Sequence, residues 1–337
     1  MLGLQDIVAA RRNLKGLVRK TPLRHSFLLS RRAGCELYLK LENLQHTGAF
    51  KVRGAINKMA SLSADERAKG VVAASSGNFA LGVAYAARAL GGVPVSLFMP
   101  VNTPLSKLDK LQEFEVKIFL RGATYEEAHD ISVEFQRQHG GTYVHTYDDP
   151  VVVAGQGTIG LEIMEDLPQA EAIVVPIGGG GLIAGIATAA KAMNPRIKII
   201  GVQPEASPAA YLSLKEGRCY ERYEAAPTIC EGLAGGFGIV PFRIAKDLID
   251  EVVLVSEEET RAAIFALLEA EQLVVEGSGA VGVAALLFDK VDLKGRKVVA
   301  VISGGNIDAD LLFEIMGECL QKQQHRTSRR FSDLREV

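Results

Sequence analysis

Hydrophobic and polar residues follow two different periods along the chain. Residues 36–42 alternate strictly and place Leu37, Leu39 and Leu41 on one face, which predicts a half-buried strand. Short continuous apolar runs, which are typical of strands buried on both faces, recur further on. They lie at residues 71–75, 93–99, 172–176, 197–202 and 298–302.

Helical periods separate these runs, at residues 78–90, 125–139 and 182–193. Ser256 followed by Glu259 forms a capping box, which predicts the start of another helix. Strands that alternate with helices favour parallel sheets covered by helices on both faces. We therefore predict an α/β protein with two lobes, each an open, twisted, mostly parallel sheet.

The order of these units also predicts how the chain divides into domains. We expect a small domain at residues 66–146 and a large domain made of residues 1–65 and 147–320. The basic run at residues 325–330 is expected to be solvated, within a C-terminal tail over residues 321–337. Ligands of open α/β sheets bind at the carboxyl ends of the strands, so the loops there are the candidate sites.

Composition narrows the possible partners to small molecules. Hydrophobic residues make up 48%, charged residues 23%, and the net charge is −2, which gives no sign of a nucleic-acid surface. No apolar run is long enough for a membrane span, and the N-terminus lacks the pattern of a signal peptide. The cysteines form no CxxC pair and suit a reducing cytosol, so we expect a cytoplasmic protein; they are Cys35, Cys219, Cys230 and Cys319.

A lysine lies in the first candidate loop, TGAFKVRGA at residues 47–55. Lys51 is expected in the first turn of the helix that follows. The partial positive charge of a helix N-terminus favours the neutral amine, and capture of an aldehyde requires a neutral amine. The alternative is an ordinary solvated lysine.

Two further loops carry small polar residues. Ser75, Ser76, Gly77 and Asn78 precede a helix and could bind a carboxylate, although simple N-capping is an alternative. Ser303 follows the last apolar run and could form a hydrogen bond with a ligand nitrogen, or it could belong to an ordinary polar turn.

Four consecutive glycines, Gly178, Gly179, Gly180 and Gly181, form the remaining candidate loop, followed by Leu182. At a strand-to-helix junction their N–H groups can converge on a phosphate. The loop is not a Walker A motif, because no Lys-Ser/Thr pair follows. It also matches GxGxxA, ending at Ala184, so a nicotinamide-dependent oxidoreductase is a rival interpretation.

These four loops, in this order, resemble fold-type II pyridoxal phosphate (PLP) enzymes, whose fold is like that of tryptophan synthase β. The branch they resemble is that of threonine/serine dehydratases (threonine ammonia-lyases) and serine racemases, over roughly residues 5–320. The resemblance implies that the large domain binds PLP, with Lys51 as the Schiff-base lysine and α-proton base. It further implies cofactor contacts by Phe50 (ring), Asn78 (3′ oxygen), Gly178–Gly181 with Leu182 (phosphate), Glu276 and Ser303 (pyridine nitrogen).

The resemblance implies a lyase that eliminates the β-hydroxyl of L-threonine or L-serine and yields a 2-oxo acid and ammonia. The substrate would lie against residues 75–78, and a homodimer or higher homo-oligomer is implied as well. Ser76 resembles a racemase residue that acts on the face opposite Lys51, so a racemase is an alternative. A third possibility is an amino-acid sensor without turnover, although such a protein has no need of a nucleophilic lysine.

The segment after residue 201 bears on metal binding. The cation-activated relatives carry acids where this chain has Gln203 and Ala209. A hard divalent cation needs charged oxygen ligands. We therefore predict no metal at this segment, and we favour a dehydratase over a racemase.

Overall fold

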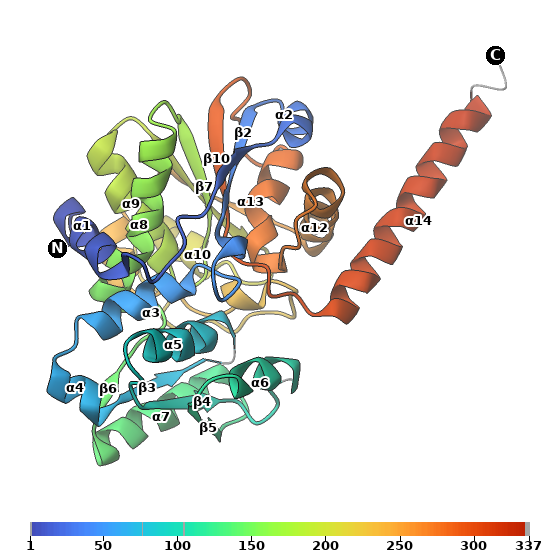
Figure 1. Ribbon diagram of the computed structural model, residues 1–337. Helices are drawn as coiled ribbons and strands as arrows, with labels where there is room; N and C mark the ends of the chain where they lie inside the picture. The colour runs from blue at the N-terminus through green and yellow to red at the C-terminus, as the bar shows by residue number, and fades with distance from the viewer. Residues whose placement is uncertain (1, 76, 104, 334–337) are drawn as a thin grey trace.

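The computed structural model describes residues 2–75, 77–103 and 105–333, and it contains two β-sheets (Figure 1). A six-stranded sheet has the order β1-β2-β10-β7-β8-β9, and a four-stranded sheet has the order β5-β4-β3-β6. The strands are β1 Leu23–His25, β2 Glu36–Leu41, β3 Val71–Ala74, β4 Val95–Met99, β5 Lys117–Leu120, β6 Thr142–Tyr143, β7 Ala172–Pro176, β8 Lys198–Pro204, β9 Glu251–Val255 and β10 Lys297–Ile302.

Helices connect nearly all of these strands. They are α1 Leu4–Leu14, α2 Phe27–Ala33, α3 Lys51–Ala60, α4 Ala64–Lys69, α5 Asn78–Ala89, α6 Leu105–Gln112, α7 Tyr125–His139, α8 Pro150–Asp166, α9 Gly181–Met193, α10 Ala209–Glu216, α11 Ile239–Ala245, α12 Glu257–Glu271, α13 Gly277–Leu287 and α14 Ala309–Asp333, with short 3₁₀ helices η1 Glu42–Leu44 and η2 Glu231–Leu233.

The large sheet is buried on both faces. Its strands pair in parallel except β1, which runs antiparallel to β2 at the edge. Successive residues of β7 point to opposite sides: Val174 joins the core formed with α12 and α13, and Ile173 joins the core formed with α8 and α9. This double burial explains why β7 and β10 are continuous apolar runs in the sequence.

The small sheet is entirely parallel. Helices α3 and α5 cover one face, where Val52 and Val83 pack against β3 and β4. On the other face Phe98 stacks against Phe119, with Phe135 of α7 beside them. Figure 1 shows α3 between the two sheets, so the helix that begins at Lys51 belongs to the contact between the lobes.

The predicted α/β class and mostly parallel sheets are confirmed, and so are the predicted strands and helices within one or two residues at most ends. Ser256 caps α12 as expected and accepts a hydrogen bond from the backbone N–H of Glu259.

The predicted half-buried strand β2 is confirmed in part. Leu37, Leu39 and Leu41 are buried and Glu36 and Tyr38 are partly exposed. Lys40, on the polar face, is instead fully buried, and its Nζ lies 2.6 Å from Glu162 Oε2.

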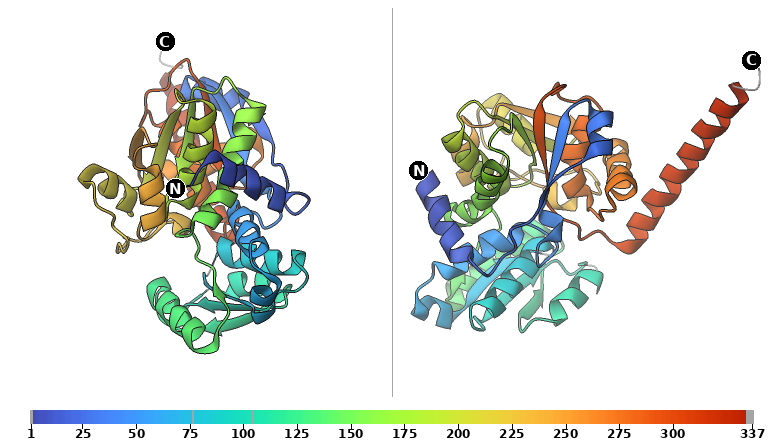
Figure 2. Two further views of the ribbon diagram at one scale, coloured as in Figure 1. Left: turned by 90° about the vertical axis from the view of Figure 1, so that its left-hand side faces the viewer. Right: turned by 45° about the horizontal axis from the view of Figure 1, so that its top comes forward.

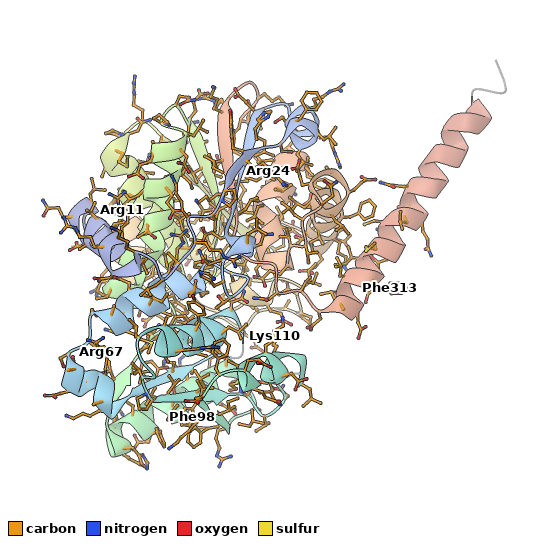
Figure 3. All side chains as sticks on the ribbon, in the orientation of Figure 1. Arg11, Arg24, Arg67, Phe98, Lys110 and Phe313 are labelled. Atoms are coloured by element: carbon orange, nitrogen blue, oxygen red, sulfur yellow. The ribbon has the colours of Figure 1, made fainter. Side chains whose placement is uncertain are left out.

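The strands of the small sheet all fall within residues 66–146, and those of the large sheet fall outside that range. Whether these limits bound independent domains stays a prediction. Residues 321–333, expected in a tail, continue α14 as helix. Figures 1 and 2 show α14 extending away from both sheets, and Figure 3 shows Phe313 on it, 79% exposed. None of the helices in the described part of the chain is long and apolar enough to cross a membrane.

A close contact between two helices, α3 and α8, predicts a stability effect. A Cβ at Gly155 of α8 would lie 2.7 Å from the carbonyl oxygen of Arg53 in α3, so Gly155→Ala must push the two helices apart. We expect the free energy of unfolding to fall by about 1–3 kcal/mol, measured by denaturant titration. Gly317→Ala in α14, where a Cβ meets nothing within 4 Å, is the matched control and should stabilise the protein slightly. Equal stabilities of the two variants would contradict the packing.

Candidate active site

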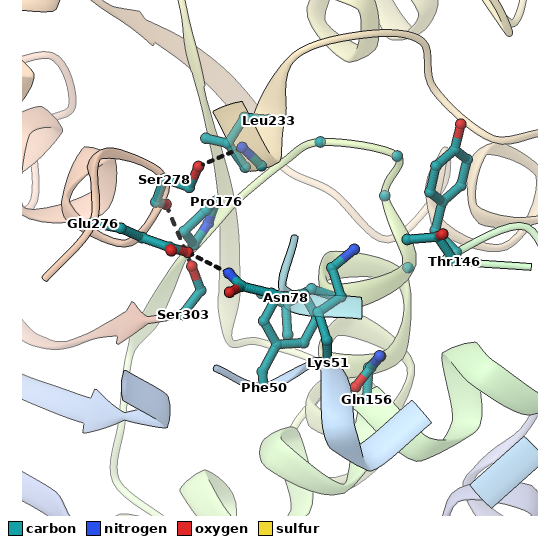
Figure 4. Close-up of a pocket in the computed structure, with 17 residues that line it drawn as sticks. Phe50, Lys51, Asn78, Thr146, Gln156, Pro176, Leu233, Glu276, Ser278 and Ser303 are labelled. Atoms are coloured by element: carbon teal, nitrogen blue, oxygen red, sulfur yellow. Dashed lines mark hydrogen bonds between the residues drawn. The ribbon is translucent and has the colours of Figure 1, made fainter. Parts of the chain in front are cut away.

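The four candidate loops meet at one pocket between the two sheets (Figure 4). It lies at the carboxyl ends of β7 and β10, where the chain turns toward a helix or loop. All the residues that the sequence predicted to bind the cofactor line it: Phe50, Lys51, Asn78, Gly178, Gly179, Gly180, Gly181, Leu182, Glu276 and Ser303.

Lys51 is the first residue of α3, as expected. The N–H of Phe50 donates to the carbonyl oxygen of Ser303 at 3.0 Å, which fixes the start of α3 to the end of β10. Lys51 Nζ lies 5.3 Å from the centre of the Phe50 ring. Burial lowers the pKa of Lys51 to about 8, while the negative charge of Glu276 opposes this shift. The sequence analysis also expected a lowered pKa for Lys51, from the positive end of the helix, but the main cause is desolvation by burial.

The glycine loop joins β7 to α9 and presents its N–H groups to the pocket. In the described chain, no backbone N–H from Gly178 to Leu182 donates to a protein acceptor. The loop has no room for side chains, since a Cβ at Gly179 would lie 2.3 Å from the ring of Tyr147. Gly180 has φ +90°, a conformation that favours glycine. Free N–H groups at a helix N-terminus make this loop a binding site for an anion such as phosphate.

A chain of hydrogen bonds fixes the amide of Asn78. Asn306 Nδ2 donates to Asn78 Oδ1 at 2.7 Å, and Asn78 Nδ2 donates to Glu276 Oε1 at 2.8 Å. Burial raises the pKa of Glu276, and the hydrogen bond from Asn78 opposes this shift. The Asn78 amide therefore enters the pocket in one orientation, with its donor group on the side of Glu276.

Ser303 ends β10 and is nearly buried, with 3% of its surface exposed. Its Oγ lies 3.4 Å from the carbonyl oxygen of Ser278, which is a long contact and leaves the hydroxyl free to bind a ligand. The carboxyl group of Glu276 also lines this pocket, but the side chain at the end of β10 is the hydroxyl of Ser303. A ligand nitrogen here would therefore meet a neutral hydroxyl.

A larger cleft of about 1090 Å³ opens from the pocket and shares Lys51, Asn78 and Glu276 with it. Ser75 and Gly77, predicted to bind substrate, line this cleft, and Ser75 Oγ accepts the N–H of Gly77 at 3.3 Å. Ser76, predicted to be catalytic, lies outside the described residues. The substrate loop thus borders the lysine pocket from the side of the small sheet.

The sequence analysis missed several residues that line the pocket. Gln156 of α8 is almost fully buried, and its Oε1 accepts the N–H of Gly54 in the first turns of α3 at 3.2 Å. None of the missed residues belongs to the four candidate loops, so only the packing shows that they line the pocket. The missed residues are Thr146, Tyr147, Gln156, Pro176, Gly232, Leu233 and Ser278.

Gln203 is fully buried at the place considered for a metal. Its Nε2 donates to the carbonyl oxygen of Ile177 at 3.3 Å, and its Oε1 accepts the N–H of Tyr211 at 2.9 Å. Both ends of the amide are therefore engaged by the protein. The absence of a metal at this segment stays a prediction.

Comparison with known proteins gives the family. The model of the family described as pyridoxal-phosphate dependent enzyme matches residues 14–304. The chain belongs to this family. The predicted fold-type II class and the predicted cofactor are thereby confirmed, and the dinucleotide interpretation of the glycine loop loses its support.

Individual relatives cover almost the whole chain. The chain is 50% identical to an L-threonine ammonia-lyase of Thermotoga maritima, over 96% of this chain and 80% of the relative. It is 41% identical to a catabolic L-threonine dehydratase of Escherichia coli, over 94% and 96%. These relatives belong to the lyase class and the branch that the sequence resembles.

Solved structures agree. A threonine deaminase isoform from Solanum lycopersicum has a TM-score of 0.88 and 37% identity, over 93% of this chain and 86% of that one. A serine racemase from Dictyostelium discoideum has a TM-score of 0.85 and 36% identity, over 91% and 99%. Both types of enzyme therefore share this fold at similar identity.

The pocket fits PLP in three independent respects. The glycine loop offers N–H groups without a protein acceptor for a phosphate, at the N-terminus of α9. Lys51 has a lowered pKa, as an aldehyde-capturing amine requires. Asn78 and Ser303 offer polar groups to the remainder of the ring. The specific contact of each residue stays a prediction.

The lowered pKa of Lys51 predicts a pH dependence. The neutral amine becomes the major form as the pH rises through about 8, rather than near 10.5. We expect the rate at which the apo-protein captures PLP, followed by visible absorbance, to be half-maximal near pH 8. Free N-acetyl-lysine is the reference and should respond only at higher pH. Identical profiles for the two amines would show that burial does not activate Lys51.

Proposed function

We propose that the protein is a PLP-dependent ammonia-lyase that converts L-threonine, and also L-serine, to a 2-oxo acid and ammonia. The observation that carries the proposal is the half-buried Lys51 amine, placed between the anion-binding glycine loop and Ser303 in one pocket. The L-threonine ammonia-lyase and dehydratase relatives, at 50% and 41% identity, support threonine as substrate.

Bound PLP supplies an electron sink that acidifies the α-carbon of an attached amino acid. The residues of the chain orient the reactants around it. The N–H groups of residues 178–182 hold the phosphate, and Asn78, with its amide fixed by Asn306, binds the ring oxygen. Ser303 would offer a neutral hydroxyl to the ring nitrogen, which would moderate the electron withdrawal that the cofactor supplies. This suits an elimination, in which the β-hydroxyl leaves before a full carbanion is stored.

Lys51 has two tasks in this proposal. Its Nζ would hold the cofactor, and, once free and neutral, the same atom would accept the α-proton of the substrate. A pKa near 8 leaves a useful fraction of the amine neutral at cytoplasmic pH. The N-terminal end of α5, with Ser75 and Gly77 before it, holds the substrate carboxylate through its partial positive charge.

A racemase activity on the same scaffold is the second candidate, favoured by the Dictyostelium discoideum serine racemase structure. Racemisation needs an acid–base group on the face opposite Lys51, and Ser76 is the residue we propose for it. A cytoplasmic location and a homodimer or larger homo-oligomer are also part of the proposal. The four cysteines, none of which forms a disulfide, are consistent with that location.

Replacing the lysine tests the function directly. Lys51→Ala should reduce release of 2-oxobutyrate from L-threonine, and of pyruvate from L-serine, to background, because it removes both anchor and base. Lys69→Ala, on the exposed surface of α4, is the matched control and should retain full activity. Full activity of Lys51→Ala, or no oxo acid from either substrate with the wild type, would refute the proposal. Chiral analysis of recovered serine measures the racemase alternative.

The metal prediction has its own test. Because Gln203 presents a fully engaged amide instead of a carboxylate, we expect a chelator to leave the turnover number unchanged. Added magnesium or calcium should have no effect either. A clear loss with chelator that either cation restores would contradict the prediction.

A further inference from the structure

Four charged side chains are buried together behind the pocket. Arg53 and Lys40 are each 0% exposed, Glu42 is 0% exposed, and Glu162 is 8% exposed. They come from α3, β2, η1 and α8. None of them lines the pocket or the cleft, so the proposed mechanism gives them no direct role.

Arg53 is held by two carboxylates at once. Its Nε and Nη2 donate to Glu42 at 2.8 and 2.9 Å, and its Nη1 and Nη2 donate to Glu162 at 2.7 and 2.9 Å. Lys40 Nζ completes the group with 2.6 Å to Glu162 and 2.7 Å to the carbonyl oxygen of Thr21. Two positive and two negative charges balance, and bidentate pairing of this kind permits only one geometry.

Stability alone is a weak reason for such a group. A buried ion network often stabilises a protein no more than apolar side chains of the same volume, because desolvation offsets the attraction. The network instead fixes the position of α3 relative to the large sheet and α8. It ties the first turn of α3 to the end of β2 and to the middle of α8.

The geometry of the helix connects the network to Lys51. Residues two apart on an α-helix point in nearly opposite directions, about 200° around the axis. Lys51 therefore faces the pocket while Arg53 faces the interior of the large lobe. On the same side, Gln156 of α8 binds the N–H of Gly54, so α8 holds the consecutive positions Arg53 and Gly54 of α3 by its polar groups and by the close approach of Gly155.

We propose that Arg53 and Glu162 are positioning residues, which through the buried network set the place of Lys51 Nζ relative to the cofactor and the substrate α-carbon. The proposal rests on the proposed function for its turnover measurements. Capture of PLP by the apo-protein tests it independently of the reaction, since that step requires only the family's cofactor.

The test uses two glutamates three residues apart on α8. Glu162→Gln removes one carboxylate of the network and leaves the side chain's shape. Glu165→Gln is the matched control, because Glu165 forms an exposed ion pair with Arg11 on the outer surface of α1 (Figure 3). We expect Glu162→Gln to lower both kcat and the PLP capture rate by about tenfold or more, since small displacements of a reacting group have effects of this size. KM and the control variant should change little.

A charge-balanced double variant separates positioning from stability. Lys40→Met combined with Glu162→Gln leaves Arg53 paired with Glu42, so no net charge is buried. We expect the melting temperature to return toward that of the wild type while kcat and the capture rate stay low. Recovery of kcat and capture together with the melting temperature would overturn the proposal. If the wild type releases no oxo acid, the proposed function fails. The positioning role is then still tested by PLP capture, and a capture rate of the double variant equal to that of the wild type would overturn it.

Discussion

The contact between α3 and α8 is the constraint on which the active site depends. Gly155 lets the two helix backbones approach so closely that a single added carbon would collide with the Arg53 carbonyl. Within this contact the Arg53 guanidinium is enclosed by two carboxylates and fixes the register of the helices. Since α3 begins at Lys51 and packs between the sheets, this one contact relates Lys51 to both lobes.

The pocket, unlike the buried network around Arg53, provides positive potential through backbone N–H groups. The backbone N–H groups of the glycine loop provide positive potential without any charged side chain, so a phosphate can bind without an ammonium group that would compete with the reactive amine. Burial lowers the pKa of Lys51, and Glu276, whose negative charge opposes this shift, has a raised pKa itself. The pocket thus relies on the N–H groups of the glycine loop, and on two ionisable side chains with shifted pKa values, rather than on a pair of oppositely charged side chains.

The two sheets contribute different parts of this site. The large sheet supplies the glycine loop and Ser303 at the ends of neighbouring strands, β7 and β10. The small sheet supplies residues 75–78 at the end of β3, and exposed ion pairs such as Arg222–Asp130 join the lobes at the cleft. Relatives named as lyases and as racemases share this fold, so the fold alone does not decide which reaction is catalysed.

The sequence by itself determined the strands that are buried on both faces and the loops that follow them. Continuous apolar runs marked β3, β4, β7, β8 and β10, and because parallel strands end at one edge, the polar loops after them could be expected to meet. It did not mark the strands β1, β5, β6 and β9, which are short or carry polar ends.

Only the tertiary structure decided what lies between these elements. The alternation of β2 suggested a solvated polar face, yet Lys40 is buried there because α8 brings Glu162 against it. The pocket is also lined by Gln156, Tyr147 and Ser278. They come from segments distant in sequence from the candidate loops, and no local sequence pattern predicts which distant segment will pack there. The sequence fixes the period of burial along each element, whereas the partner that satisfies a buried charge is set by the packing of the whole chain.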